Sequence, residues 1–266
     1  RRSSDLVSPR PWNRNSMRTI RWRGAGESMT RVDVVAFDPG GTTGWAVLQC
    51  DSSALDGRAR NTQSALWELL LHKDYGEIDC GTKQNETGVG VKRGHGAQNI
   101  LGEDIGVDQI LDIVLRKFPA SAIVTEDFIL DMGRADMSRD ILLPVRIMAR
   151  MDYGLHRDWA LHHRSGRHPL HRFFVQNRAL AKTTCSDTRL RNWKLYDPKS
   201  GPHARDAMRH AYYFLRSCRG NDPASALRRH LAWPHLFADP AKLTNSDIPK
   251  AGRKPAKKGT VIPHLR

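Results

Sequence analysis

The residues of this 266-residue chain that are best placed to do chemistry are three acids at the ends of predicted elements. Asp38 and Glu126 each follow an apolar run, and Asp206 lies in the first turn of a predicted helix, three residues after His203. His203 and Asp206 therefore point from one face of that helix. Carboxylates that gather in one place repel each other and need a cation. Oxygen ligands with one imidazole suit Mg²⁺, for which Mn²⁺ can substitute.

Such a ligand set is typical of phosphodiester hydrolysis. Two divalent ions bridged by one aspartate can activate a water molecule and stabilise the leaving oxygen. Each residue alone also has an ordinary structural interpretation. Asp38 stands before Pro39 and Gly40, as turn acids often do, and Asp206 stands near a helix start, as partners of the helix dipole do. The three acids as an ordered set favour the metal site.

Asp127 competes with Glu126 for the second position of this set. Because side chains alternate along a strand, Glu126 shares a face with Ala122 and Val124, whereas Asp127 lies on the opposite face. Only one of the two acids can therefore face the site, and alternation alone does not choose between them.

The hydrophobic pattern predicts the elements that must position these residues. Short apolar runs bounded by turn residues indicate strands, and apolar residues at helical spacing indicate helices. The expected strands are 32–37, 44–48, 77–81, 122–125 and 173–176; the expected helices are 105–118, 141–159 and 202–216, and the expected loop is 82–100. Three strands followed by alternating helices and strands predict an α/β sandwich on a mixed sheet.

Charge is distributed unevenly along the chain. The net formal charge is +15, and residues 1–31 and 250–266 carry +6 each. Between them, residues 32–145 carry −8 and residues 146–219 carry +11. An acidic part followed by a basic part indicates a carboxylate-rich centre beside a surface that binds a polyanion. Solvated surface charge is the alternative, and charge does not separate DNA from RNA.

Composition divides the chain into a central domain and two extensions. Residues 1–30 are predicted to be a flexible basic arm and residues 31–218 the central α/β domain. Residues 219–266, interrupted by six prolines, are predicted to be a mostly disordered basic tail with one short helix near 224–231. No apolar run is long enough to cross a membrane, and no Cys-x-x-Cys pair occurs. These features predict a cytoplasmic protein without a membrane partner.

Basic side chains between residues 146 and 219 are candidate contacts to nucleic acid. Arg146 and Arg150 lie one turn apart on the predicted helix 141–159, and Arg205 lies on the helix 202–216. Lys182 can contact the scissile phosphate or its neighbour. A solvated helix face or an ordinary surface lysine explains the same residues. Five histidines between residues 156 and 171 favour a phosphate-contacting loop over a zinc site, since no thiolate accompanies them.

Three segments contain the candidate acids. They are Val34-Val35-Ala36-Phe37-Asp38-Pro39-Gly40 with Thr43-Gly44-Trp45-Ala46-Val47, Ala122-Ile123-Val124-Thr125-Glu126, and Pro202-His203-Ala204-Arg205-Asp206-Ala207-Met208. In order and spacing, they resemble the opening strand and hairpin, the second acidic strand and the final helix of the RuvC-type Holliday-junction resolvases, in particular those of bacteriophages. The segments together cover about residues 32–216.

This resemblance implies an RNase H-like mixed β-sheet flanked by helices. It also implies a homodimer that nicks branched DNA such as four-way junctions in pairs, with Mg²⁺, during DNA recombination and repair in the host cytoplasm. By motif, Asp38 would bridge two metal ions, Glu126 and Asp206 would ligate them, and His203 would be a ligand or a proton-transfer group. The resemblance also favours Glu126 over Asp127. The family's basic signature before the last helix is matched only loosely, around Lys182.

Other functions stay open at this point. The segment Asp38-Pro39-Gly40-Gly41-Thr42-Thr43-Gly44 also resembles the first phosphate loop of actin-like sugar kinases, which are ATP-dependent phosphotransferases with a related sheet. No second Asp-Gly-Thr loop and no Gly-Gly adenosine motif follows it. A nuclease of the same superfamily acting on RNA or flaps, and a binding protein without catalysis, are the further alternatives.

Overall fold

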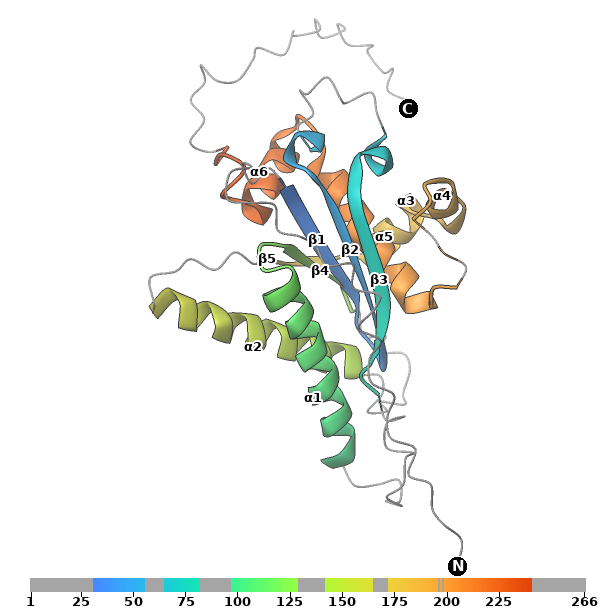
Figure 1. Ribbon diagram of the computed structural model, residues 1–266, viewed down its shortest axis with the longest axis vertical. Helices are drawn as coiled ribbons and strands as arrows, with labels where there is room; N and C mark the ends of the chain where they lie inside the picture. Colours follow the sequence, from blue (N-terminus) through green and yellow to red (C-terminus); the bar gives the residue numbers. More distant parts are fainter. Residues whose placement is uncertain are drawn as a thin grey trace, which may run out of the picture.

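The computed structural model describes residues 31–55, 65–81, 97–128, 142–164, 172–195, 197 and 199–240. The arm expected over residues 1–30, the tail beyond residue 240 and His168 and His171 of the histidine group lie outside these residues. Within them, a five-stranded sheet is enclosed between two layers of helices (Figure 1).

The sheet combines antiparallel and parallel strands in the order β3-β2-β1-β4-β5. The strands are β1 (Arg31–Asp38), β2 (Thr42–Asp51), β3 (Leu70–Asp79), β4 (Ala122–Glu126) and β5 (Arg172–Gln176). Strands β1, β2 and β3 form an antiparallel meander, and β4 and β5 run parallel to β1. This is the expected RNase H-like fold. Strand β3 begins earlier than the expected 77–81, because it pairs with β2 over nearly the whole length of that strand.

The two faces of the sheet build two separate cores. Along β1, Val34 and Ala36 belong to one hydrophobic cluster, and Val35 and Phe37 belong to the other. A central strand that is buried on both faces reads as a continuous apolar run rather than as an alternating one. The same alternation sends Asp38, which follows Phe37, to the face of Val34 and Ala36.

Each face is covered by its own set of helices. The helices α1 (Ala97–Asp112) and α2 (Leu143–Arg164) cover the Phe37 face, and α1 continues into a π-helical turn at Ile113–Lys117. On the opposite face lie α3 (Arg178–Thr184), α4 (Asp187–Asn192), α5 (Pro202–Cys218) and α6 (Pro223–Ala232) (Figure 1). Helix α5 contacts β1, β2, β3 and β4 and so spans most of the sheet. None of the described helices is both long and apolar enough to cross a lipid bilayer.

Packed structure continues past residue 218, where the sequence analysis places the end of the domain. The short helix expected near 224–231 is present as α6, and Asp222 caps its first turn by accepting from Ser225 N at 2.9 Å. Trp233, directly after α6, is fully buried in the α5-side core, and its Nε1 donates to the Asp33 carbonyl at 3.2 Å. The first part of the expected tail therefore completes this core.

We expect Trp233→Ala to lower the free energy of unfolding by about 3–5 kcal/mol, because it empties a large buried volume. Chemical denaturation measures this loss. The matched control is Trp159→Ala on α2, where the side chain is 40% exposed and the change should stay within about 0.5 kcal/mol. Equal effects of the two substitutions would show that residues after 218 do not stabilise the domain.

Candidate active site at the carboxyl edge of the sheet

Polar residues from four of the five strands, and Gly44 of the fifth, lie at one level of the sheet on the face that α5 covers. Register places Glu77 of β3 opposite Gly44 of β2, and Gly44 opposite Asp38 of β1. Glu126 of β4 stands one residue beyond the pair formed by Phe37 and Thr125, and Gln176 of β5 stands opposite Glu126. Because residues in register share a face, this row lies under the first half of α5.

The first turn of α5 lies directly on the backbone of β2 at Gly44. A Cβ atom on Gly44 would come within 2.0 Å of the carbonyl carbon and oxygen of His203, so only glycine fits there. The helix begins at Gly201-Pro202 without a capping side chain of its own. Glu77 supplies the cap, since its Oε1 accepts from the backbone N–H of His203 at 3.0 Å and of Ala204 at 3.3 Å. A carboxylate at this end also complements the helix dipole.

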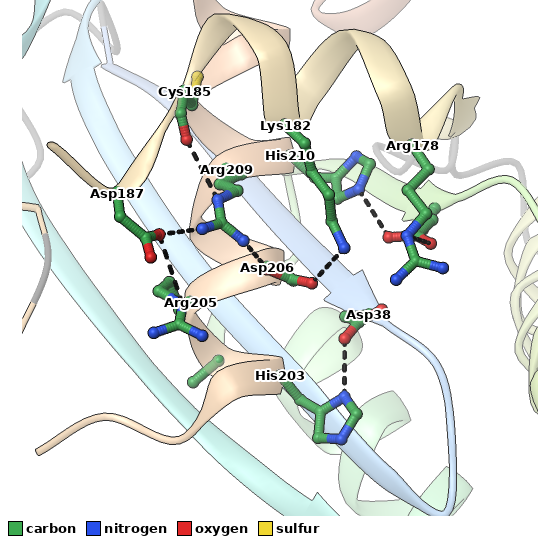
Figure 2. A network of polar contacts seen from close by, with 12 residues as sticks. Asp38, Arg178, Lys182, Cys185, Asp187, His203, Arg205, Asp206, Arg209 and His210 are labelled. Atoms are coloured by element: carbon green, nitrogen blue, oxygen red, sulfur yellow. Dashed lines mark hydrogen bonds and ion pairs between the residues drawn. The ribbon is translucent and has the colours of Figure 1, made fainter. Parts of the chain in front are cut away.

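Asp38 occupies the centre of the row and is bound by His203. Nδ1 of His203 lies 2.8 Å from Oδ2 of Asp38 (Figure 2). Burial raises the pKa of Asp38; the hydrogen bond from His203 lowers it, and the charges of Glu126 and Asp206 raise it again. Glu126 and Asp206 thus lie close enough to Asp38 to repel its charge, and the pKa of Asp38 is raised as a result.

Glu126 is held from two sides by side chains of different exposure. Its Oε2 lies 3.1 Å from Nε2 of His210, which is fully buried, and its Oε1 lies 3.1 Å from Nε of Arg178, whose side chain is 63% exposed. The other ring nitrogen of His210 lies 3.1 Å from Oε1 of Gln176. Asp127 is exposed. The structure therefore places Glu126, and not Asp127, beside the other acids.

Asp206 is also held from two sides. Lys182 Nζ of α3 lies 2.7 Å from its Oδ2, and the guanidinium of buried Arg209 pairs with its Oδ1 (Figure 2). Arg209 also pairs with Asp187 and donates through Nε to the carbonyl of Cys185 at 3.1 Å. A buried guanidinium needs such a set of acceptors, and here it joins α5 to the end of α3 and the start of α4.

The predicted DNA-binding residues separate into two groups. Lys182 lies in the site, and Arg205 lies beside it, with Nε 3.7 Å from Asp187. Arg146 and Arg150 lie on α2, across the sheet, where they pair with Glu103 and Asp104 of α1, respectively. These two arginines therefore connect helices on the face away from the acids.

Sequence reasoning missed four residues that build the site: Glu77, Arg178, Arg209 and His210. One signal for His210 was present, because His203, Asp206 and His210 stand at i, i+3 and i+7 on α5 and so form one stripe. The helix start at Gly201, without a side chain able to cap it, was a second signal, since the free N–H groups had to find an acceptor elsewhere. Arg178 and Arg209 carried no such signal.

A divalent cation is implied by the donor set, which can be tested against the contacts. Among the described residues, no three His, Cys, Asp or Glu side chains converge closely enough to form a ready metal centre. Three carboxylates and one imidazole nevertheless suit a hard cation. Positive side chains, Lys182 and Arg178, already stand against Asp206 and Glu126. The donors therefore fit such an ion, provided that it replaces these two side-chain cations.

Comparison with known proteins gives structural likenesses alone. No protein-family model and no curated protein matches the sequence. Among solved structures, Thermus thermophilus RuvC is similar at a TM-score of 0.40 and 13% identity, over 76% of this chain and 99% of that chain. T. thermophilus RuvC in complex with Holliday junction substrate is similar at a TM-score of 0.37 and 13% identity, over 71% and 95%.

We expect Gly44→Ala to lower the free energy of unfolding by at least about 1–3 kcal/mol, because the new methyl group displaces the first turn of α5. The control is Gly41→Ala in the same hairpin, where a Cβ meets nothing closer than Leu143 Cδ2 at 3.6 Å. Chemical denaturation of both variants measures the difference. If both are equally stable, α5 does not depend on close approach at Gly44.

In EDTA, we expect Asp38→Asn to stabilise the folded protein at pH 7. The pKa of Asp38 is raised on folding, so its ionised form is disfavoured in the folded state above that pKa, and asparagine removes this penalty. The gain should shrink as pH falls toward 3.8, the ordinary pKa of the group, and vanish below it, where the aspartate is protonated in both states. Denaturation curves between pH 3.5 and 7.5 measure it, with exposed Asp152→Asn as control. A less stable Asp38→Asn at pH 7 would mean that the His203 contact outweighs burial and repulsion.

Proposed function

We propose that this protein is a Mg²⁺-dependent, structure-selective endonuclease that resolves Holliday junctions and other branched DNA by paired nicks. The observation that carries the proposal is the gathering of Asp38, Glu126, Asp206 and His203 at one edge of an RNase H-like sheet. The negative charges of Glu126 and Asp206 lie near enough to Asp38 to raise its pKa. We assign it to RuvC-like resolvases of the bacteriophage type, acting as a homodimer in the host cytoplasm. Mn²⁺ would substitute for Mg²⁺.

The proposal gives each side chain a distinct task. Two divalent ions bound by the three carboxylates would supply the Lewis acidity that activates a water molecule and stabilises the leaving 3′ oxygen. Asp38, which is half-buried and feels the charges of both other acids, would be the ligand that the ions share. His203 is held through Nδ1 by Asp38, and its 43% exposed ring can exchange a proton at Nε2 with substrate or solvent.

DNA would approach over α3 and the start of α5. Lys182 and Arg178 stand one turn apart on α3, and Arg205 stands on α5 next to Asp206. With divalent ions on the carboxylates, the ammonium of Lys182 and the guanidinium of Arg178 would become available to phosphate oxygens. Arg146 and Arg150 would contact DNA only by giving up Glu103 and Asp104, so we expect them to contribute less than Lys182.

Hydrogen bonds within the first hairpin disfavour the sugar-kinase alternative. The turn after Asp38 resembles a phosphate loop in sequence, but the Thr43 hydroxyl donates to the Gly40 carbonyl at 3.0 Å and accepts from Gly40 N at 3.2 Å. The Gly41 carbonyl accepts from Cys80 N at 2.8 Å. The Thr43 hydroxyl and the Gly40 N–H are thus already hydrogen-bonded within the loop, so the loop does not present them to a phosphate.

We expect a labelled four-way junction to be nicked symmetrically in Mg²⁺, and linear duplex to stay uncut. EDTA and Asp38→Asn should each abolish cleavage. Asp38→Asn should still bind the junction at least as tightly as the unaltered protein, because the substitution removes a negative charge that repels phosphate. Gel-based cleavage and binding assays measure both quantities.

Further substrates and one paired control separate the alternatives. Equal cutting of a flap or an RNA–DNA hybrid would keep the metal chemistry but replace the junction by another substrate. Tight binding without cleavage in Mg²⁺ or Mn²⁺ would leave a binding protein. In the same assay with Ca²⁺, Lys182→Gln should lower the salt dependence of binding by about one phosphate contact, and Arg150→Gln should change it less.

A further inference from the structure

His210 is a fully buried polar side chain beside the acids, and neither the predicted ligand set nor the predicted DNA contacts include it. Its ring is fully buried and joins two neighbouring strand ends, with Nε2 3.1 Å from Glu126 Oε2 and Nδ1 3.1 Å from Gln176 Oε1. Glu126 and Gln176 stand opposite each other in the register of β4 and β5. A carboxylate only accepts hydrogen bonds, so Nε2 is the donor to Glu126.

The two oxygens of Glu126 therefore have unlike partners. Oε2 is held by a side chain that water does not reach, and Oε1 is held by Arg178, which is largely exposed. An exposed ion pair contributes little and exchanges readily with solvent. A buried hydrogen bond cannot open without leaving a polar group unsatisfied. Oε1 is thus the oxygen that can be released to a new partner, while Oε2 stays fixed.

Asp206 repeats this arrangement with different residues. Its Oδ1 pairs with buried Arg209 of α5, and its Oδ2 lies on Lys182 of α3, whose side chain is 32% exposed (Figure 2). Arg209 and His210 are consecutive residues of α5, and Arg178 and Lys182 are one turn apart on α3. Each acid is thus held from inside by α5 and covered from outside by a cation of α3.

We infer that His210 is a positioning residue, which holds Glu126 Oε2 so that Oε1 is presented to a divalent cation once Arg178 withdraws. The amide group of Gln176, 3.1 Å from Nδ1, holds the ring of His210 from its other side. This inference rests on the proposed function, because it takes Glu126 as a metal ligand. It adds which oxygen binds, which residue orients it, and which residue the ion displaces. Partners of this kind, one shell beyond the ligands, commonly change metal affinity by about 10- to 100-fold.

The test is Mn²⁺ affinity without DNA, measured by electron paramagnetic resonance of the free ion on the full chain. His210→Phe keeps a ring but removes both nitrogens, and should weaken binding by about 10- to 100-fold. His210→Gln retains an amide donor for Glu126 and should recover most of that loss. Arg178→Gln removes the competing cation from Oε1 and should bind Mn²⁺ at least as tightly as the unaltered protein.

Mn²⁺ affinity should fall in His210→Phe and should not fall in Arg178→Gln, and this difference separates a positioning role from an effect on stability alone. A structural role alone would leave Mn²⁺ affinity unchanged in His210→Phe, or would make His210→Gln as weak as His210→Phe, and either result overturns the inference. If His210→Phe does not fold, Gln176→Leu replaces it, because releasing the ring should still weaken Mn²⁺ binding several-fold; unchanged affinity in that variant also overturns the inference. Asp38→Asn reports on the proposed function itself: if the unaltered protein shows no Mn²⁺ binding that Asp38→Asn removes, the metal site fails first and the role of His210 fails with it.

Discussion

The close approach of α5 to β2 at Gly44 fixes the geometry of the whole site. The backbone of His203 packs directly on Gly44, which has no side chain, and this contact fixes the position of the start of α5 on the sheet. Glu77 completes the seat, because its carboxylate takes the free N–H groups of the first turn from the neighbouring strand. Once the start of α5 is fixed, the stripe His203, Asp206 and His210 must fall across the ends of β1 and β4. The contact at Gly44 therefore places His203, Asp206 and His210 beside their partners.

The site combines this rigid seat with unfavourable electrostatics. Three carboxylates lie near one another, and the pKa of Asp38 is raised by burial and by the charges of its two acidic neighbours. The fold offsets the remaining charge with its own cations, one from α3 against each of Glu126 and Asp206. Positive charge added beside Asp38 would therefore be stabilising. Functional sites commonly retain such locally unfavourable groups because the surrounding packing supports them.

Features set by local sequence could be predicted, and features set by strand register could not. Asp38 and Glu126 end apolar runs, and Asp206 follows His203 at helical spacing, so all three were visible in the chain. Whether Glu126 or Asp127 faces α5 depends on which face of the sheet carries that helix, and alternation alone leaves this open.

The same limit applied to side chains that depend on a distant partner. Arg146 and Arg150 look like a basic helix face until α1 places Glu103 and Asp104 against them. The prolines of the tail predicted disorder, and nothing in the local sequence indicated that Trp233 is buried. Its burial depends on contact with β1, about 200 residues earlier in the chain.

The basic stretch 146–219 therefore offers less free charge to DNA than its sequence suggests, because part of it neutralises the protein's own acids. Lys182 and Arg178 stand on Asp206 and Glu126, and Arg209 is buried between Asp187 and Asp206. Under the proposed function, divalent ions and DNA phosphates bind opposite halves of the same ion pairs. An ion that takes a carboxylate frees a cation for phosphate, and a phosphate that takes the cation exposes the carboxylate to an ion. Such coupling is reciprocal by thermodynamic necessity, so DNA should tighten ion binding by the factor by which ions tighten DNA binding. Under the proposed function, the pairing of α3 with the acids would therefore link cleavage competence to the presence of substrate, without any movement of the sheet or of α5.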